Sequence, residues 1–85
     1  MIDKYVSDLA IQMGMNLSKV SLVDGKPLGC RDVSLLNMSS RERLVSALIF
    51  KSDLKNLEKG DSCDRLEVRI RSALSRLQLM LELRS

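Results

Sequence analysis

The chain has 85 residues, of which 45% are hydrophobic and 29% are charged, and its formal net charge is +3. This length fits one domain, and the hydrophobic share is typical of a folded chain rather than a disordered one. The sequence contains no His and no Trp, and its only aromatic residues are Tyr5 and Phe50. These absences exclude His-based catalysis, His-ligated metals and aromatic platforms for single-stranded nucleic acid.

The N-terminal segment is predicted to form a helix over residues 2–14. Its apolar residues recur at helical spacing and share one face: Ile2, Tyr5, Val6, Leu9, Ala10 and Met13. The same stripe can be continued as far as Val23, because Asp24 and Gly25 then read as a helix stop. The alternative is a β-hairpin over residues 20–30 with its turn at Asp24 and Gly25. The pattern leaves both interpretations open.

A second helix is predicted over residues 39–59. Ser39 and Glu42 have the S-x-x-E spacing of a capping box, in which each side chain satisfies a free amide of the first helical turn. Lys59 and Gly60 are typical of a helix C-terminus, because a basic side chain complements the helix dipole and Gly adopts the left-handed conformation beyond it.

A third helix is predicted over residues 61–84. Its apolar residues follow one another at spacings of three and four positions: Cys63, Leu66, Ile70, Ala73, Leu77 and Met80. The connection between the second and third helices is only about two residues long. The two helices must therefore pack antiparallel, as a helical hairpin over residues 39–84. With residues 24–38 as a loop, the predicted fold is all-α: the hairpin with the N-terminal helix packed across it.

These helices would carry more apolar faces than one small bundle can bury. The helix over residues 39–59 is apolar nearly all round in its first half, and the last helix has a lesser apolar face of its own. We therefore predict a non-enzymatic protein-interaction module, such as a regulator, an adaptor or a secretion-type chaperone, that self-associates or binds a protein partner. The predicted partner-binding residues are Leu44, Leu48, Ile49, Phe50, Val68, Leu79 and Leu83.

The alternative prediction is a dimeric DNA-binding regulator. Arg65, Arg69 and Arg76 lie within about 40° of one another on the predicted last helix, and Arg41 and Arg43 are candidates for the same rim. The excess positive charge lies in the C-terminal half of the chain, which suits phosphate contacts. The pattern shows no helix-turn-helix spacing, and a solvated Arg-rich face is the favoured interpretation of these arginines.

The two cysteines, Cys30 and Cys63, form no CxxC pair and supply too few ligands for a zinc site. A thiol-based redox sensor built on them is a third hypothesis. No catalytic residue, cofactor or metal is predicted. The N-terminus lacks a signal-peptide pattern, and the longest apolar stretch, residues 44–50, is too short to span a membrane. A cytoplasmic protein with reduced thiols is expected.

Overall fold

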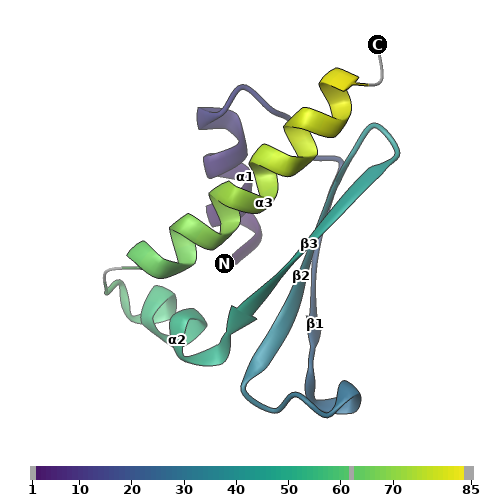
Figure 1. Cartoon of the computed structure of the whole chain (residues 1–85). Helices are drawn as coiled ribbons and strands as arrows, with labels where there is room; N and C mark the ends of the chain where they lie inside the picture. Colours follow the sequence, from purple (N-terminus) through teal and green to yellow (C-terminus); the bar gives the residue numbers. More distant parts are fainter. Residues whose placement is uncertain (1, 62, 84–85) are drawn as a thin grey trace.

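The computed structural model describes residues 2–61 and 63–83 and has an α+β fold (Figure 1). The elements in chain order are α1 (Ile2–Gln12), β1 (Lys19–Asp24), the 3-10 turn η1 (Lys26–Leu28), β2 (Val33–Ser40), β3 (Arg43–Phe50), α2 (Lys51–Lys59) and α3 (Asp64–Leu83). The prediction of an all-α bundle with a helical hairpin over residues 39–84 is therefore wrong. Its first helix, predicted over residues 39–59, is replaced up to Phe50 by the end of β2, a turn and strand β3.

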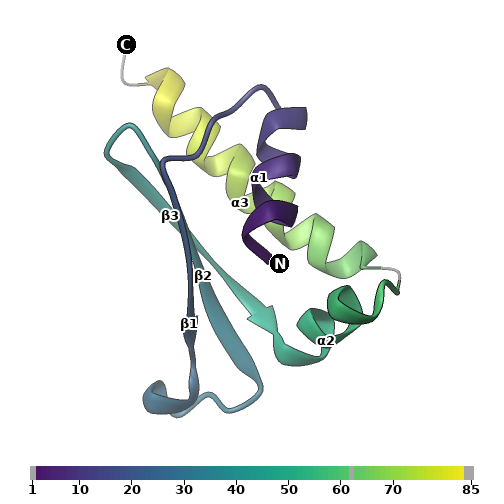
Figure 2. The same cartoon turned by 180° about the vertical axis from the view of Figure 1, so that it is seen from behind.

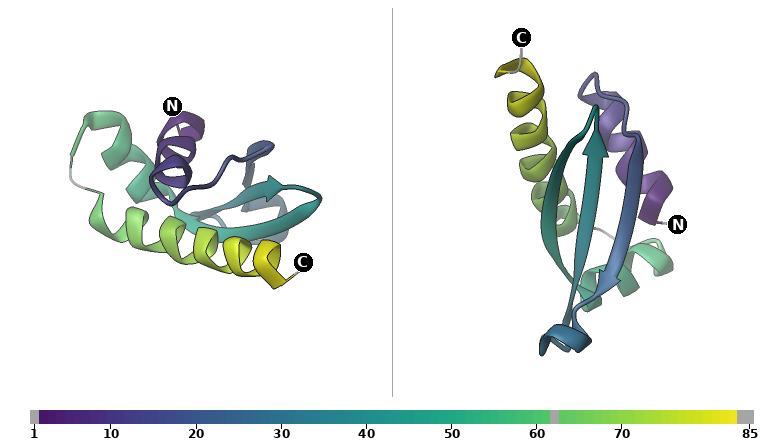
Figure 3. Two further views of the ribbon diagram at one scale, coloured as in Figure 1. Left: turned by 90° about the horizontal axis from the view of Figure 1, so that it is seen from above. Right: turned by 90° about the vertical axis from the view of Figure 1, so that its right-hand side faces the viewer.

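The three strands form one antiparallel sheet in the order β1-β2-β3. Leu36 of the central strand lies opposite Leu22 of β1 and Ala47 of β3. Helix α3 packs on β3 and β2, and α1 packs on α3 and β1, so both helices lie on the same face of the sheet (Figure 1 and Figure 2). The opposite face, called the outer face below, has no helix over it in the right-hand view of Figure 3.

A two-residue turn joins β2 to β3 where the sequence suggested a helix N-terminus. Arg41 and Glu42 both have positive φ, 49° and 68°, as a type I′ hairpin turn requires. Ser40 and Arg43 face each other across this turn. The prediction of a helix-capping box at Ser39 is therefore wrong. The S-x-x-E spacing is present, but the backbone turns back on itself there instead of entering a helix.

Residues 44–50 carry apolar side chains on both faces of strand β3, and this pattern resembles a helix that is apolar on all sides. Val45, Ala47 and Ile49 point into the core, whereas Leu44 and Leu48 point to the outer face and are exposed. A short apolar run satisfies both a buried helix and a strand with two apolar faces, so periodicity alone cannot separate them. The absence of a clean polar and apolar alternation therefore does not exclude a strand here.

Residues 19–24 form β1, so the proposed continuation of the N-terminal helix to Val23 is wrong, and α1 ends at Gln12. The alternative hairpin over residues 20–30 had the correct first strand but the wrong partner, because β1 pairs with β2. The predicted loop 24–38 is therefore wrong over residues 33–38, which belong to β2. Gly25 allows this arrangement. A Cβ atom there would lie 2.6 Å from the carbonyl oxygen of Val33.

One hydrophobic core fills the space between the sheet and the two longer helices. Of the seam predicted from spacing, α3 buries Leu66, Ile70, Ala73 and Leu77 in this core, together with the neighbouring Leu74. The two ends of the seam, Cys63 and Met80, are partly buried against it. At the preceding boundary, α2 ends at Lys59 and Gly60 follows with φ 78°, donating its N–H to the carbonyl oxygens of Asn56 and Leu57. This helix end is the one that Lys59 and Gly60 suggested.

Candidate protein-binding site

Five of the seven predicted partner-binding residues are large apolar side chains that lie more than half exposed: Leu44, Leu48, Val68, Leu79 and Leu83. We call this set the β3–α3 surface. The other two differ. Ile49 is fully buried in the core of its own chain, so its side chain is not available to a partner. Phe50 is half-buried, with its ring under two arginines of α3.

The strand part of this surface lies on the outer face of the sheet. Leu48 stands opposite Leu35, which in turn stands opposite Val23, so an apolar row crosses all three strands. The next row is polar, with Ser46 of β3 donating from its Oγ to Asn37 of β2. The outer face is thus apolar toward the C-terminal end of β3 and polar in its middle, instead of uniformly solvated as in many antiparallel sheets.

The helical part follows one stripe of α3. Val68, Leu79 and Leu83, together with Ser72, lie within about 60° of one another around the helix axis. This stripe faces away from the core seam and is exposed. The strand and helix parts meet, because Leu48 and Val68 line one groove between β3 and α3.

This groove has a volume of about 350 Å³. Its walls are formed by Ser46 and Leu48 of β3 and by Val68, Arg69, Ser72 and Arg76 of α3. Arg76 reaches across it and donates from Nη2 to the main-chain oxygen of Ser46 at 3.1 Å. The groove therefore combines apolar walls with two guanidinium groups.

The three arginines of the predicted ridge do share one side of α3, and two of them gather at Phe50. The guanidinium carbons of Arg65 and Arg69 lie 5.0 and 4.7 Å from the centre of the Phe50 ring, which is cation–π distance. Arg65 also binds Asp53 of α2 through two hydrogen bonds of 3.1 and 2.9 Å. Asp53 is buried, and its carboxylate raises the pKa of Arg65.

Sequence reasoning missed the partners of these arginines. Asp53 lies in the first turn of α2, which begins at Lys51 and not at residue 39 as predicted. The contact of Asp53 with Arg65 at the beginning of α3 depends on this later start. No pattern in the sequence locates this contact, because the apolar run over residues 44–50 fits a helix as well as a strand and so hides the start of α2.

Arg69 contributes a further polar group to the groove. Its Nε is buried and has no hydrogen-bond acceptor among the residues that the structure describes. An unpaired buried donor is costly, and for a charged group the cost is larger. The Arg69 guanidinium contacts the Phe50 ring, but its Nε donor makes no hydrogen bond to any described residue.

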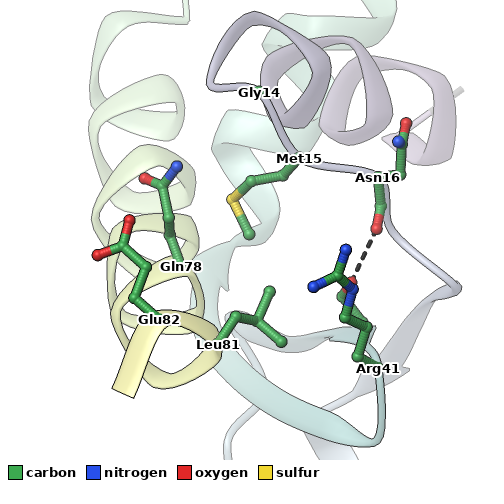
Figure 4. Close-up of a pocket in the computed structure, with 8 residues that line it drawn as sticks. Gly14, Met15, Asn16, Arg41, Gln78, Leu81 and Glu82 are labelled. Atoms are coloured by element: carbon green, nitrogen blue, oxygen red, sulfur yellow. Dashed lines mark hydrogen bonds between the residues drawn. The ribbon is translucent and has the colours of Figure 1, made fainter. Parts of the chain in front are cut away.

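A second hollow of about 380 Å³ lies between the α1–β1 connection, the β2–β3 turn and the end of α3 (Figure 4). Most of the polar side chains that line it already have partners, among them Gln78, which donates to the main-chain oxygen of Met13. Ser40 donates from Oγ to the main-chain oxygen of Asn16 at 2.9 Å, and the charged residues Arg41 and Glu82 also have partners. This hollow therefore shows no converging set of polar groups that await a ligand.

The cysteines do not form an activated pair. Both thiols are free, with Cys30 exposed and Cys63 partly buried. Burial raises the pKa of Cys63, and the carboxylates of Asp53, Asp61 and Asp64 raise it further. A reactive cysteine requires the opposite shift, so the third hypothesis gains no support from Cys63.

Residues 2–61 and 63–83 contain no group of three or more His, Cys, Asp or Glu side chains that could hold a metal ion. Over the same described part of the chain, no helix has the length and apolar character needed to cross a membrane. Comparisons of the chain with protein-family models, with curated proteins and with solved structures give no match. Function is therefore argued from the site alone.

Proposed function

We propose that this protein is a non-enzymatic interaction module of the cytoplasm, which binds a protein partner by burying the β3–α3 surface. A small regulator, an adaptor or a secretion-type chaperone acts in this way. The observation that carries the proposal is that five large apolar side chains, each more than half exposed, lie on one strand and one helix, and that two of them, Leu48 and Val68, line the groove between these elements. Exposed apolar surface of this kind marks interaction sites.

The amount of exposed surface suits a reversible complex. Full burial of a Val or Leu side chain stabilises by about 1.5–3 kcal/mol, and somewhat more than half of that is still to be gained at each of the five residues. Together they supply roughly 5–9 kcal/mol before the cost of association. This surface can therefore anchor a partner, with further contacts setting the final affinity.

The alternative function, nucleic-acid binding through the Arg ridge, is less well supported. Asp53 already neutralises Arg65, and Arg65 and Arg69 are both engaged by the Phe50 ring. Arg76 is bound to a main-chain oxygen. Guanidinium groups committed to contacts within the chain are less available to phosphates.

The proposal is tested by affinity capture from a native lysate with three forms of the full chain: wild type, Leu48→Asp and the control Leu28→Asp. Leu28 is also an exposed leucine, but it lies in η1, at the tip of the β1–β2 connection. We expect wild type and the control to retain the same stoichiometric protein band, and Leu48→Asp to lose it. Circular dichroism verifies that all three forms are folded.

Nuclease treatment of the lysate separates the two functions. A protein band that resists nuclease supports the proposal. Two results would contradict it: prey that disappears with nuclease, or prey that a folded Leu48→Asp retains in full. The first of these would support nucleic-acid binding instead.

A further inference from the structure

Strand β3 is an edge strand whose outward main-chain groups can be identified. The two-residue turn makes Ser40 and Arg43 a hydrogen-bonded pair, and such pairs alternate along an antiparallel ladder. The main chains of Val45 and Ala47 therefore face β2, and those of Leu44, Ser46 and Leu48 face the other way. Within the described residues, no strand pairs with this outward edge.

Two observed hydrogen bonds agree with this assignment. At the far end of β3 the N–H of Lys51, which continues the inward-facing series, donates to the main-chain oxygen of Asp32 at 2.9 Å. In the middle of the strand, the outward oxygen of Ser46 accepts from Arg76. The edge thus offers main-chain donors and acceptors at a two-residue period.

Arg76 occupies the place that a neighbouring strand would take. Unpaired edges are a liability, and proteins often protect them with a charged side chain. Arg76 is exposed, and its bond to Ser46 is a single contact of 3.1 Å. An incoming N–H can replace that contact, and the guanidinium is then free to meet a carboxylate on the incoming segment.

We propose that the groove between β3 and α3 takes an extended acidic segment of the protein partner, which adds to β3 as a fourth strand. Strand addition of this kind draws affinity from main-chain hydrogen bonds and specificity from alternate side chains. Apolar residues of the segment pack on Leu48 and Val68, and a carboxylate between them binds Arg76 and Arg69. The inference rests on the proposed function, since it names the chain segment that the β3–α3 surface binds.

The charge of the groove favours an acidic segment of another protein over a second copy of this chain. None of the described residues that line the groove is acidic, whereas two are arginines. A second copy of this chain that paired β3 with β3 about Ser46 would bring both copies' Arg76 side chains to the same place, where like charges repel. An acidic strand from a different protein removes this repulsion and supplies a charge-assisted hydrogen bond to Arg76.

The first experiment selects binders to the full chain from a display library of random eight-residue peptides, the length of β3. We expect enriched peptides to alternate apolar residues with period two and to carry Asp or Glu. Enriched peptides with apolar residues at helical spacing, enrichment of basic peptides, or no enrichment at all would overturn the proposal.

The second experiment measures amide hydrogen exchange by NMR with the best selected peptide bound. We expect the outward amides of Leu44, Ser46 and Leu48 to exchange more slowly in the complex, while those of Val45 and Ala47 are already slow in the free protein. Unchanged exchange at the outward amides would show that no strand has been added.

The third experiment compares Ser46→Pro with Ser46→Ala. Both lose the side-chain hydroxyl, but only proline removes the outward N–H, and an edge position tolerates proline because no ladder bond is broken. We expect Ser46→Pro to weaken peptide binding about tenfold relative to Ser46→Ala. Equal affinity of the two variants would refute strand addition.

Arg76→Glu serves as a second variant in case Ser46→Pro does not fold. Arg76 is exposed, so its substitution is compatible with folding. We expect it to weaken the acidic peptide about tenfold and to have much less effect on the matched peptide with Gln for Glu. Loss of partner capture in Leu48→Asp, together with no effect of Ser46→Pro or Arg76→Glu, would leave the proposed function intact and reject the strand.

Discussion

Neighbouring residues of β3 are expected to respond in opposite ways to the same substitution. Ile49 is fully buried, and Leu48 is 56% exposed on the opposite face of the strand. Ile49→Ala and Leu48→Ala therefore test the strand directly. On the helix predicted from the sequence, both positions would belong to the partner-binding surface, so the two substitutions would have similar effects on stability.

The magnitudes follow from burial. Truncating a buried Ile to Ala costs about 2–5 kcal/mol, because the lost transfer free energy and the cavity add. Leu48 hides less than half of its side chain, so Leu48→Ala costs about 1 kcal/mol or less. A chain of this size is stabilised by roughly 4–13 kcal/mol in total. Ile49→Ala therefore removes a large share of the stability and Leu48→Ala a small one.

Urea unfolding followed by far-ultraviolet circular dichroism measures both costs, provided that the m-values of the variants agree. Thermal unfolding gives a second reading, since 1 kcal/mol corresponds to about 4–8 °C in a domain of this size. Equal costs for the two variants, or a larger cost for Leu48→Ala, would refute the inward and outward assignment of β3.

Two further predictions concern stability. Glu42→Gly is expected to raise the urea midpoint by an amount equivalent to about 0.5 kcal/mol, because Gly adopts the positive φ of the turn without strain; a lower midpoint would contradict this. The pKa of Asp24 lies below its ordinary value, because Lys51 and the N–H of Lys26 donate to its carboxylate. A lowered native pKa stabilises the fold above about pH 4 and ceases to do so as the pH falls through it. The stability advantage of wild type over Asp24→Asn should therefore be present at pH 6 and shrink as the pH falls below about 4, and a difference independent of pH would count against the ion pair.

The candidate site was predicted in part, and for a reason that was itself wrong. Leu44 and Leu48 were assigned to an exposed stripe of a helix, and they are exposed because they alternate with core residues of a strand. Ile49 was assigned to the same surface, but strand geometry turns it inward. On α3 the prediction started from a real helix, so Val68 and Leu79 lie on the exposed stripe that their spacing indicated.

The contacts that define the groove were beyond sequence reasoning. Arg65 and Asp53 are 12 positions apart, and Arg76 and Ser46 are 30 apart. Neither separation matches a helical period. Arg65 and Asp53 meet because the start of α3 packs on α2, and Arg76 and Ser46 meet because α3 folds back along β3. Charge patterning identified the ridge of arginines, but not which acid, ring or carbonyl oxygen each one would contact.

Local side-chain spacing is enough to predict the elements whose signals are long and unambiguous. These are the seam of α3, the apolar face of α1 and the helix end at Lys59 and Gly60, where side-chain spacing and backbone preference agree. The conformation of residues 33–50, in contrast, depends on contacts between segments that are distant in sequence. Both faces of these strands carry apolar side chains, so their pattern fits helix or strand, and pairing with a partner strand distant in sequence settles the choice.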